Sequence, residues 1–169
     1  IVSDLTEARE MVDKVISYQQ EPAFDPWRNR VTLIADDVDE LGDRVLQESV
    51  NQLATEIATN RPDLNVDKIL LDSYIQVNNA GGPRYPAAVS NIEDAFERGS
   101  LVVNYFGHGN EDGLAREFVI TQNSARDYRN PNNLPLFIIV TCEFTRFDNP
   151  LRESGGEVIY LNPNGGVIA

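Results

Sequence analysis

The two residues best suited to nucleophilic chemistry are the only histidine and the only cysteine of the chain, His108 and Cys142. A thiol beside an imidazole can ionise to a thiolate, which is the nucleophile of cysteine enzymes. Glycines flank His108 on both sides, and they would let the backbone turn sharply and let a substrate approach. Each residue alone also has a simpler interpretation, because a lone cysteine is usually an inert core residue and a lone histidine is usually structural. The catalytic hypothesis therefore depends on whether the fold brings the two side chains together.

The segments that must position these residues alternate between strand and helix patterns. Short apolar and β-branched runs predict five buried strands, the last of them only begun, at residues 31–35, 69–71, 101–106, 136–141 and 165–169. Helical spacing of apolar residues predicts helices at 3–20, 39–60, 87–98, 121–129 and 151–161. We expect Ser3 or Asp4 to cap the first helix, and Ser90 and Glu93 to form a capping box in the third. This alternation predicts an α/β fold, a three-layer α/β/α sandwich with a mainly parallel sheet.

Ligands of open parallel sheets bind beyond the carboxyl ends of the strands, so the residues that follow each strand matter most for function. His108 follows the third predicted strand and Cys142 follows the fourth. Neighbouring strands lie about 4.8 Å apart, so the two side chains would come within reach if these strands are neighbours. The backbone N–H groups of Gly109 and Cys142 would then be placed to stabilise a developing oxyanion.

Two acidic residues at the end of the first strand, Asp36 and Asp37, have several candidate roles. A carboxylate there could hydrogen-bond the imidazole of His108. Either could equally cap the helix that follows, which is a common role of aspartate at such positions. Together with Asp39 they could also hold a calcium ion, although the EF-hand pattern is absent. We therefore expect no metal and no cofactor, with calcium as the remaining alternative.

The chain is strongly acidic, with 14 Lys and Arg against 27 Asp and Glu, a net charge of −13. Such a chain repels phosphate backbones, which argues against nucleic acid as a partner. Three of the acids, Glu111, Asp112 and Glu143, follow the strands that precede His108 and Cys142. They could select basic residues of a protein substrate, or they could be solvated loop charges.

The length of 169 residues fits one domain with a sizeable core. We expect an N-terminal helix and linker at 1–26, where two prolines interrupt the helical pattern, and a catalytic core at 27–169. No apolar run approaches the roughly 20 residues of a membrane-spanning helix, and a single cysteine excludes a disulfide within the chain and a cysteine-based zinc site. No signal peptide is visible, and the last residues resemble the start of a core strand. We therefore expect a fragment of a longer protein whose sheet is incomplete at its C-terminal end.

The motifs around the two candidate residues resemble a known family. Residues 104–109, Asn-Tyr-Phe-Gly-His-Gly, and residues 140–143, Val-Thr-Cys-Glu, are similar to the His-Gly and Cys motifs of gingipain-type cysteine peptidases, which belong to the caspase-like group. The closer resemblance is to the PorU-type sortase, or C-terminal signal peptidase, of the type IX secretion system. It rests on an ordered set of segments that together extend over residues 27–169: 27–37, 107–115, 141–150 and 161–166.

The resemblance implies a caspase-like fold in which Cys142 is the nucleophile and His108 the general acid and base. It implies an endopeptidase at the bacterial outer membrane or outside the cell, which removes C-terminal sorting domains from secreted proteins and can join the product to a surface lipopolysaccharide. The implied partners are substrates with such sorting domains and other components of the secretion system. An isolated fragment could be inactive, because the family's catalytic domain is longer.

Three other functions remain open. The chain could belong to an ordinary secreted gingipain-like protease that shares the dyad but not the sorting role. It could also be a non-catalytic caspase-like module that serves as a binding surface. A flavodoxin-type enzyme for small molecules is disfavoured, because no glycine-rich phosphate loop follows the first strand.

Overall fold

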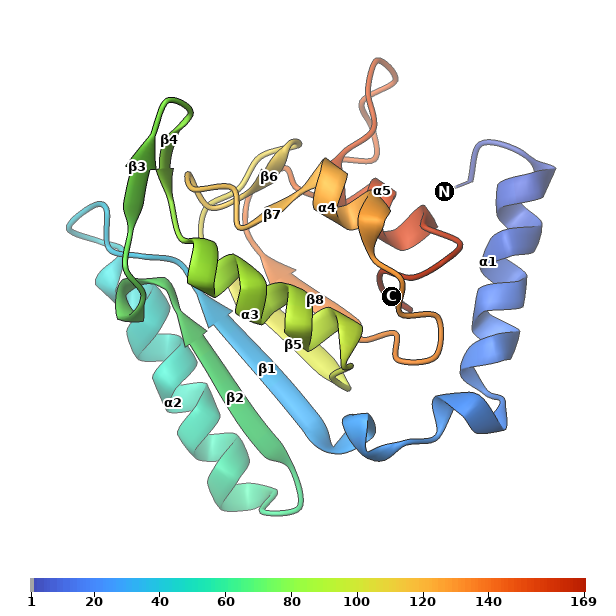
Figure 1. The fold of residues 1–169 in the computed structure, drawn as a ribbon, viewed down its shortest axis with the longest axis horizontal. Helices are drawn as coiled ribbons and strands as arrows, with labels where there is room; N and C mark the ends of the chain where they lie inside the picture. The colour runs from blue at the N-terminus through green and yellow to red at the C-terminus, as the bar shows by residue number, and fades with distance from the viewer. Residues whose placement is uncertain (1) are drawn as a thin grey trace.

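Four parallel strands form the centre of the computed structural model, which describes residues 2–169 (Figure 1). Their order in the sheet is β2-β1-β5-β8. In chain order the elements are α1 (Leu5–Tyr18), β1 (Arg30–Ala35), α2 (Arg44–Asn60), β2 (Asn65–Leu70), β3 (Val77–Asn79), β4 (Gly82–Arg84), α3 (Pro86–Glu97), β5 (Val102–Phe106), β6 (Gly113–Leu114), β7 (Ile120–Thr121), α4 (Gln122–Asp127), β8 (Leu136–Val140) and α5 (Gly155–Leu161). Short 3₁₀ turns lie at Glu21–Ala23, Pro26–Asn29 and Leu71–Ser73.

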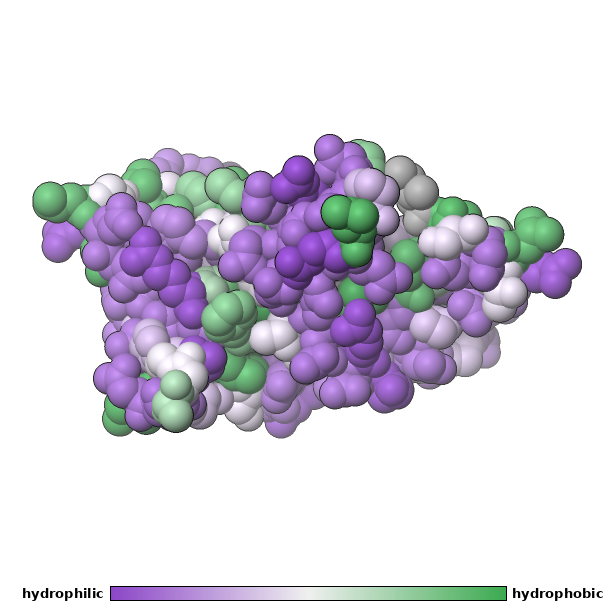
Figure 2. All heavy atoms as spheres, turned by 90° about the horizontal axis from the view of Figure 1, so that it is seen from above, coloured by the Kyte–Doolittle hydropathy of each residue, from purple (hydrophilic) through white to green (hydrophobic). Residues whose placement is uncertain are grey.

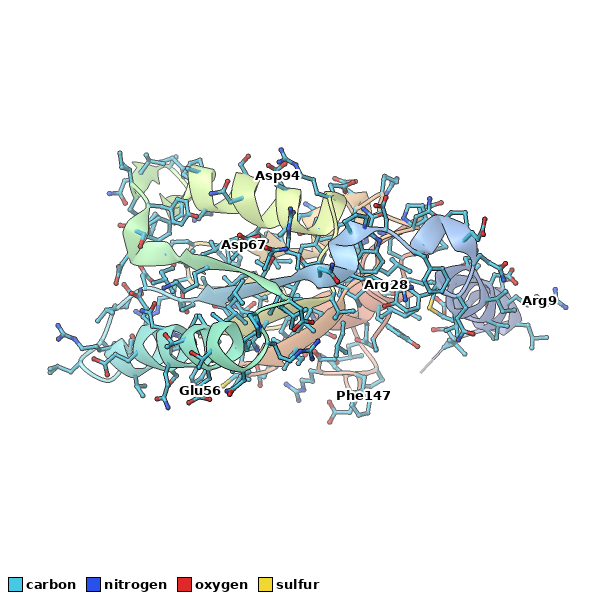
Figure 3. All side chains as sticks on the ribbon, turned by 90° about the horizontal axis from the view of Figure 1, so that it is seen from below. Arg9, Arg28, Glu56, Asp67, Asp94 and Phe147 are labelled. Atoms are coloured by element: carbon cyan, nitrogen blue, oxygen red, sulfur yellow. The ribbon has the colours of Figure 1, made fainter. Side chains whose placement is uncertain are left out.

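Helices cover both faces of this sheet, which confirms the predicted α/β/α fold class. The side chains of β1 alternate, so that Leu33 packs with α2 on one face and Ile34 packs with α3 and α5 on the other. Figure 3 shows α2 and α3 on opposite sides of the strands, with Glu56 on α2 and Asp94 on α3 pointing outward. The larger apolar cluster lies on the α3 side and includes the fully buried Phe96.

The strands that precede His108 and Cys142 are neighbours, which meets the condition for the two residues to come within reach. In the parallel pairing of β5 with β8, Phe106 lies opposite Val140. The ladder continues one residue further, because Gly107 N–H donates to Val140 O at 3.2 Å. Both strands therefore end at the same edge of the sheet, and the residues that follow them start from matching positions.

Two local expectations were wrong and one was confirmed. Residues 165–169 form no strand, although Ile168 N–H and Ala169 O bond to Pro135 and Phe137 beside the start of β8. Ser90 lies inside α3 and makes no capping box, because the helix already begins at Pro86, whose fixed φ suits the first helical position. Helix α1 is capped by Asp4 as expected, with its side chain accepting from the N–H groups of Thr6 and Glu7.

Most of the apolar stripe of α1 faces solvent. Leu5, Val12, Val15 and Ile16 are all exposed, whereas Met11 and Lys14 are buried. The ammonium group of Lys14 donates to the carbonyl oxygens of Tyr160 and Asn162 at 2.9 and 3.0 Å. These polar contacts, rather than the apolar stripe, attach α1 to the end of α5.

Strand β8 lies at the edge of the sheet, and one of its faces is bare. Leu136, Ile138 and Val140 are 40%, 44% and 49% exposed, whereas Phe137 is buried against α3.

Among residues 2–169, no helix combines the length and the hydropathy needed to cross a bilayer. Figure 2 looks down on the side where the strands end, and hydrophilic residues dominate that face.

Candidate active site

His108 is held at the sheet edge by the close approach of Gly107 to the end of β1. A Cβ added to Gly107 would lie 2.6 Å from the Tyr105 hydroxyl and 2.8 Å from Asp36 Oδ2. Only glycine can occupy such a position without displacing its neighbours. The missing side chain thus allows the β5 and β1 ends to meet and brings His108 beside Asp36.

Asp36 makes two hydrogen bonds to His108. Its Oδ2 atom accepts from the backbone N–H at 2.8 Å and lies 3.1 Å from the ring Nδ1. Asp36 is only 2% exposed, so this carboxylate is shielded from water. The bond fixes the ring orientation and favours the tautomer in which Nδ1 carries a proton and Nε2 is available for proton transfer.

Asp37 does not contact His108. Its Oδ2 atom accepts a hydrogen bond from the Tyr85 hydroxyl at 2.9 Å instead. Neither Asp36 nor Asp37 caps α2, because that helix begins at Arg44 with Asp43 as its N-cap residue. Of the two acids proposed from the sequence as partners of the imidazole, the structure therefore brings only Asp36 to it.

A second carboxylate near His108 was missed by the sequence analysis. Asp43 Oδ1 lies 3.7 Å from the ring Nε2, so carboxylates face both ring nitrogens. Asp43 lies at the end of the loop that joins β1 to α2. No local sequence pattern predicts that this loop returns to the imidazole. The helix predicted at residues 39–60 includes Asp43, whereas α2 begins only at Arg44 and Asp43 is its N-cap residue.

Cys142 is exposed and lies two residues beyond Val140, just as His108 lies two residues beyond Phe106. The loops that carry them touch, since a Cβ added to Gly109 would lie 2.7 Å from Thr141 Oγ1. Among the hydrogen bonds of residues 2–169, none joins the Cys142 thiol to the His108 ring. The structure thus places both residues at one sheet edge without a direct bond between them.

The turn after Cys142 is anchored in the core. Glu143 adopts a left-handed backbone conformation with φ 51°, and Phe144 N–H donates back to Cys142 O at 2.6 Å. The Phe144 ring is fully buried, and Gly155 leaves the space for it because a Cβ there would overlap the ring. The exposed thiol therefore sits on a turn whose next side chain is fixed.

The two backbone N–H groups proposed as an oxyanion hole have no hydrogen-bond acceptor among the described residues. Neither Gly109 N–H nor Cys142 N–H donates a hydrogen bond within the described part of the chain. Gly109 instead lies opposite Leu114 in an isolated antiparallel bridge. Both N–H groups are therefore free to donate a hydrogen bond to a bound molecule.

Comparison with known proteins identifies the family. The sequence model of peptidase family C25 matches residues 1–169. The chain belongs to peptidase family C25. Within this family of gingipain-type cysteine peptidases, the chain resembles the crystal structure of the Arg-specific cysteine proteinase gingipain R (RgpB), with a TM-score of 0.73 and 19% identity over 98% of the chain. It also resembles RgpB in the complex of the Porphyromonas gingivalis pro- and mature domains, with a TM-score of 0.72 and 18% identity over 98% of the chain.

The likeness to these structures is one of fold. The chain spans 37% and 38% of the two gingipain chains, little more than a third of their length. No curated protein sequence matches the chain significantly. The family assignment therefore rests on the C25 sequence model and the caspase-like fold on the structural match.

The acids near the site of this C25 chain are paired with arginines. Glu111 lies 3.3 Å from Arg152 and 3.8 Å from Arg146, Asp112 also pairs with Arg152, and Glu143 lies 3.4 Å from Arg146. The pairs of Glu111 and Asp112 join the loop after β5 to the loop after β8, whereas the Glu143–Arg146 pair lies within the loop after β8. A substrate role for the three acids stays a prediction, and it would require a basic substrate residue to compete with these arginines.

Asp37 belongs to a different group of acids in the C25 chain. It lies beside Glu117, which the sequence analysis did not single out, in the loop between β6 and β7. Burial raises the pKa of Asp37 to about 6 and that of Glu117 to about 7. Asp39, the third predicted calcium ligand, turns away and pairs with Arg116 at 3.2 Å.

Proposed function

We propose that this C25 chain carries the catalytic pair of a cysteine endopeptidase, with Cys142 as nucleophile and His108 as general acid and base. The observation that supports this proposal most is the matching position of the two residues after neighbouring strands. Each lies two positions beyond a neighbouring parallel strand, at the edge where such sheets bind ligands. With Asp36 on the ring Nδ1, the atom that would exchange a proton with the thiol and the leaving group is Nε2, which lies 3.7 Å from Asp43 Oδ1.

The mechanism follows from these placements. The Cys142 thiolate would attack the scissile carbonyl carbon, and the oxyanion would accept hydrogen bonds from Gly109 N–H and Cys142 N–H. His108 would then protonate the leaving amine and release the C-terminal product. Water, or an amine or sugar acceptor, would resolve the acyl-enzyme, with His108 removing the proton from the incoming group.

The finer proposal is that the whole protein is a type IX secretion sortase of PorU type. The motif order that the chain shares with such proteins supports it, from the Trp-Arg-Asn-Arg segment at residues 27–30 to the Asn-Pro-Asn-Gly-Gly segment at 162–166. Its substrates would be secreted proteins with C-terminal sorting domains, and it would act at the cell envelope or outside the cell. An ordinary secreted gingipain-like protease is the alternative within the same family.

The test uses the whole protein that contains this chain. Cys142→Ala should abolish peptide cleavage, whereas Thr141→Ser, a matched change next to it, should leave cleavage close to the wild-type rate. Undiminished cleavage by Cys142→Ala would refute the assignment of the nucleophile. Incubation with a secreted protein that ends in a sorting domain, and with the same protein lacking it, separates a sortase from an ordinary protease. A protein that cleaves neither and whose Cys142 resists electrophiles would be the non-catalytic module.

A further inference from the structure

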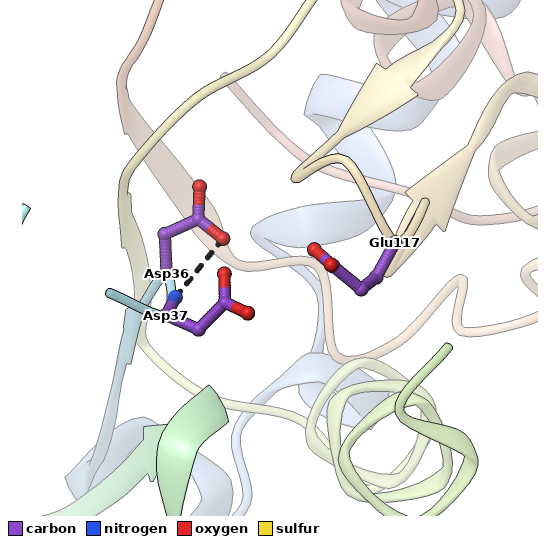
Figure 4. A group of neighbouring side chains, drawn as sticks. All are labelled: Asp36, Asp37 and Glu117. Atoms are coloured by element: carbon purple, nitrogen blue, oxygen red, sulfur yellow. Dashed lines mark hydrogen bonds between the residues drawn. The ribbon is translucent and has the colours of Figure 1, made fainter. Parts of the chain in front are cut away.

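Three buried carboxylates meet just behind the proposed catalytic edge. One oxygen each from Asp36, Asp37 and Glu117 lies within 4.8 Å of the other two. The three residues are 2%, 5% and 1% exposed. In Figure 4 the Glu117 carboxylate, carried by the β6–β7 loop, points toward the two aspartates at the end of β1.

No basic side chain neutralises Asp37 or Glu117 within the described chain. Arg116, next to Glu117, points outward and pairs with Asp39 and Glu40. Burying a carboxylate without a partner costs several kcal/mol, by the order of magnitude of ion desolvation. Asp37 and Glu117 thus have no positive charge beside them among the described residues to offset this cost.

The hydrogen bonds at the cluster leave an oxygen open toward its centre. Glu117 Oε1 accepts from the Gln76 amide at 3.2 Å, whereas Glu117 Oε2 is buried with no hydrogen-bond partner. Asp37 uses Oδ2 for the Tyr85 hydroxyl. Asp36 uses Oδ2 for His108, and its Oδ1 accepts only a 3.2 Å bond from the N–H of Asp37. The Glu117 carboxylate points toward the two aspartates and carries a buried oxygen with no partner, so it has a free ligand atom for a cation.

The donors and their spacing suit a hard divalent ion. All three side chains offer oxygen, which calcium and magnesium prefer, and neither nitrogen nor sulfur is among the donors. Calcium binds oxygen at about 2.3–2.6 Å in flexible geometries, so two of its ligands can lie up to about 5 Å apart. Magnesium demands shorter bonds and stricter octahedral geometry, which this cluster is less suited to give.

We propose that Asp36, Asp37 and Glu117 bind one divalent cation, best matched by calcium, and that Asp36 bridges this cation and His108. The third ligand is Glu117 rather than Asp39, the residue that the sequence pattern suggested. Because Asp36 holds the imidazole with one oxygen and would face the cation with the other, occupancy would stiffen the support of His108. The site stands whether or not the chain is a peptidase, since binding is measured without substrate.

The test is calcium binding by the protein after EDTA treatment and dialysis. Thermal unfolding should show Tm rising by about 5–10 °C at a calcium concentration 100-fold above Kd, as expected for a domain of this size. Terbium should bind the same site and luminesce when tyrosine is excited, because the Tyr85 hydroxyl contacts Asp37. His108 is the only histidine, so shifts of its imidazole NMR signals on adding calcium report on the bridge through Asp36.

Glu117→Gln is the decisive variant, and Glu40→Gln is its matched control. Glu117→Gln keeps the shape of the side chain and removes one charged ligand, so calcium affinity should fall about tenfold or more. Glu40→Gln makes the same change at an exposed acid that pairs with Arg116 and should bind calcium like the wild type. Asp37→Asn serves as a second variant if Glu117→Gln does not fold.

Two results would overturn the site. One is a wild-type protein whose Tm and terbium luminescence do not respond to ions at concentrations on the order of 1 mM, the range of weak extracellular calcium modules. The other is equal calcium binding by wild type, Glu117→Gln and Asp37→Asn, which would mean that the acidic surface binds ions diffusely. His108 signals that stay unmoved at saturation would contradict the bridge through Asp36.

Discussion

Replacing Asp36 with asparagine tests how the fold holds the imidazole of His108. The carboxylate is 2% exposed, and its Oδ2 atom bonds both the backbone N–H and the ring Nδ1 of His108. Asparagine has the same shape, so the change removes the negative charge while leaving an oxygen able to accept both bonds. The substitution therefore isolates the electrostatic part of the support.

The size of the effect follows from these two bonds. A hydrogen bond to a charged group contributes about 1.5–3 kcal/mol, and a neutral one contributes about 1 kcal/mol. Each bond should thus weaken by about 0.5–2 kcal/mol, and the pair by about 1–4 kcal/mol. If the full loss falls on the transition state, kcat should decrease by about 5-fold to 10³-fold.

The assay is peptide cleavage by the whole protein in EDTA, so that the proposed cation site does not contribute. We expect kcat to fall and KM to stay nearly constant, because Asp36 positions the base and does not contact substrate. Asp39→Asn is the control, since Asp39 comes from the same loop but pairs with Arg116. A folded Asp36→Asn protein with a kcat within about twofold of wild type would refute the positioning role.

Two further predictions concern stability. Phe96→Ala should lower the free energy of unfolding in urea by about 3–5 kcal/mol. The Phe96 ring is fully buried, stacks on Tyr128 with ring centroids 4.5 Å apart and meets Phe137 edge-on with centroids 5.4 Å apart. A loss of less than about 1 kcal/mol would contradict this packing. Burial lowers the pKa of Lys14 to about 8. Between pH 8 and 10 the folded state therefore binds fewer protons than the unfolded state. The free energy of unfolding should rise over this range by up to about 1.4 kcal/mol per pH unit. Lys14→Met lacks the titrating group and therefore this rise of the unfolding free energy with pH. The unfolding free energy of the wild type minus that of Lys14→Met should thus increase from pH 7 to pH 9.5. A constant difference would argue against a buried ammonium.

Local patterns were sufficient for the elements that carry the site. The apolar, β-branched runs before His108 and Cys142 became β5 and β8, as their composition predicts for parallel strands, although one face of β8 is exposed. The prediction that both residues emerge at one sheet edge follows from parallel pairing alone. The helix of residues 3–20 was also predicted, but its periodicity did not show which face would pack, and Lys14 was buried in place of the apolar stripe.

The contacts that depend on long-range packing could not be predicted. Asp43 reaches the His108 ring across a loop, and Glu117 joins Asp36 and Asp37 from a segment some 80 residues away in the chain, between two-residue strands that have no periodicity to detect. The expected strand at 165–169 was wrong because pairing with β8 is also a long-range contact, which the local apolar pattern does not determine. Val167 is buried, as a strand residue would be, yet the backbone makes only end contacts with β8.

The central claim is that His108 and Cys142 act as a pair, and the alkylation rate of Cys142 tests it most directly. Cys142 is the only thiol of the chain, so iodoacetamide labels one site without ambiguity. At pH 6.5 we expect the wild type to react about tenfold or more faster than His108→Ala, because the imidazole would accept the thiol proton and leave the reactive thiolate. Equal rates in the two folded proteins would mean that the thiol and the imidazole do not interact, and the proposed catalytic pair would not exist.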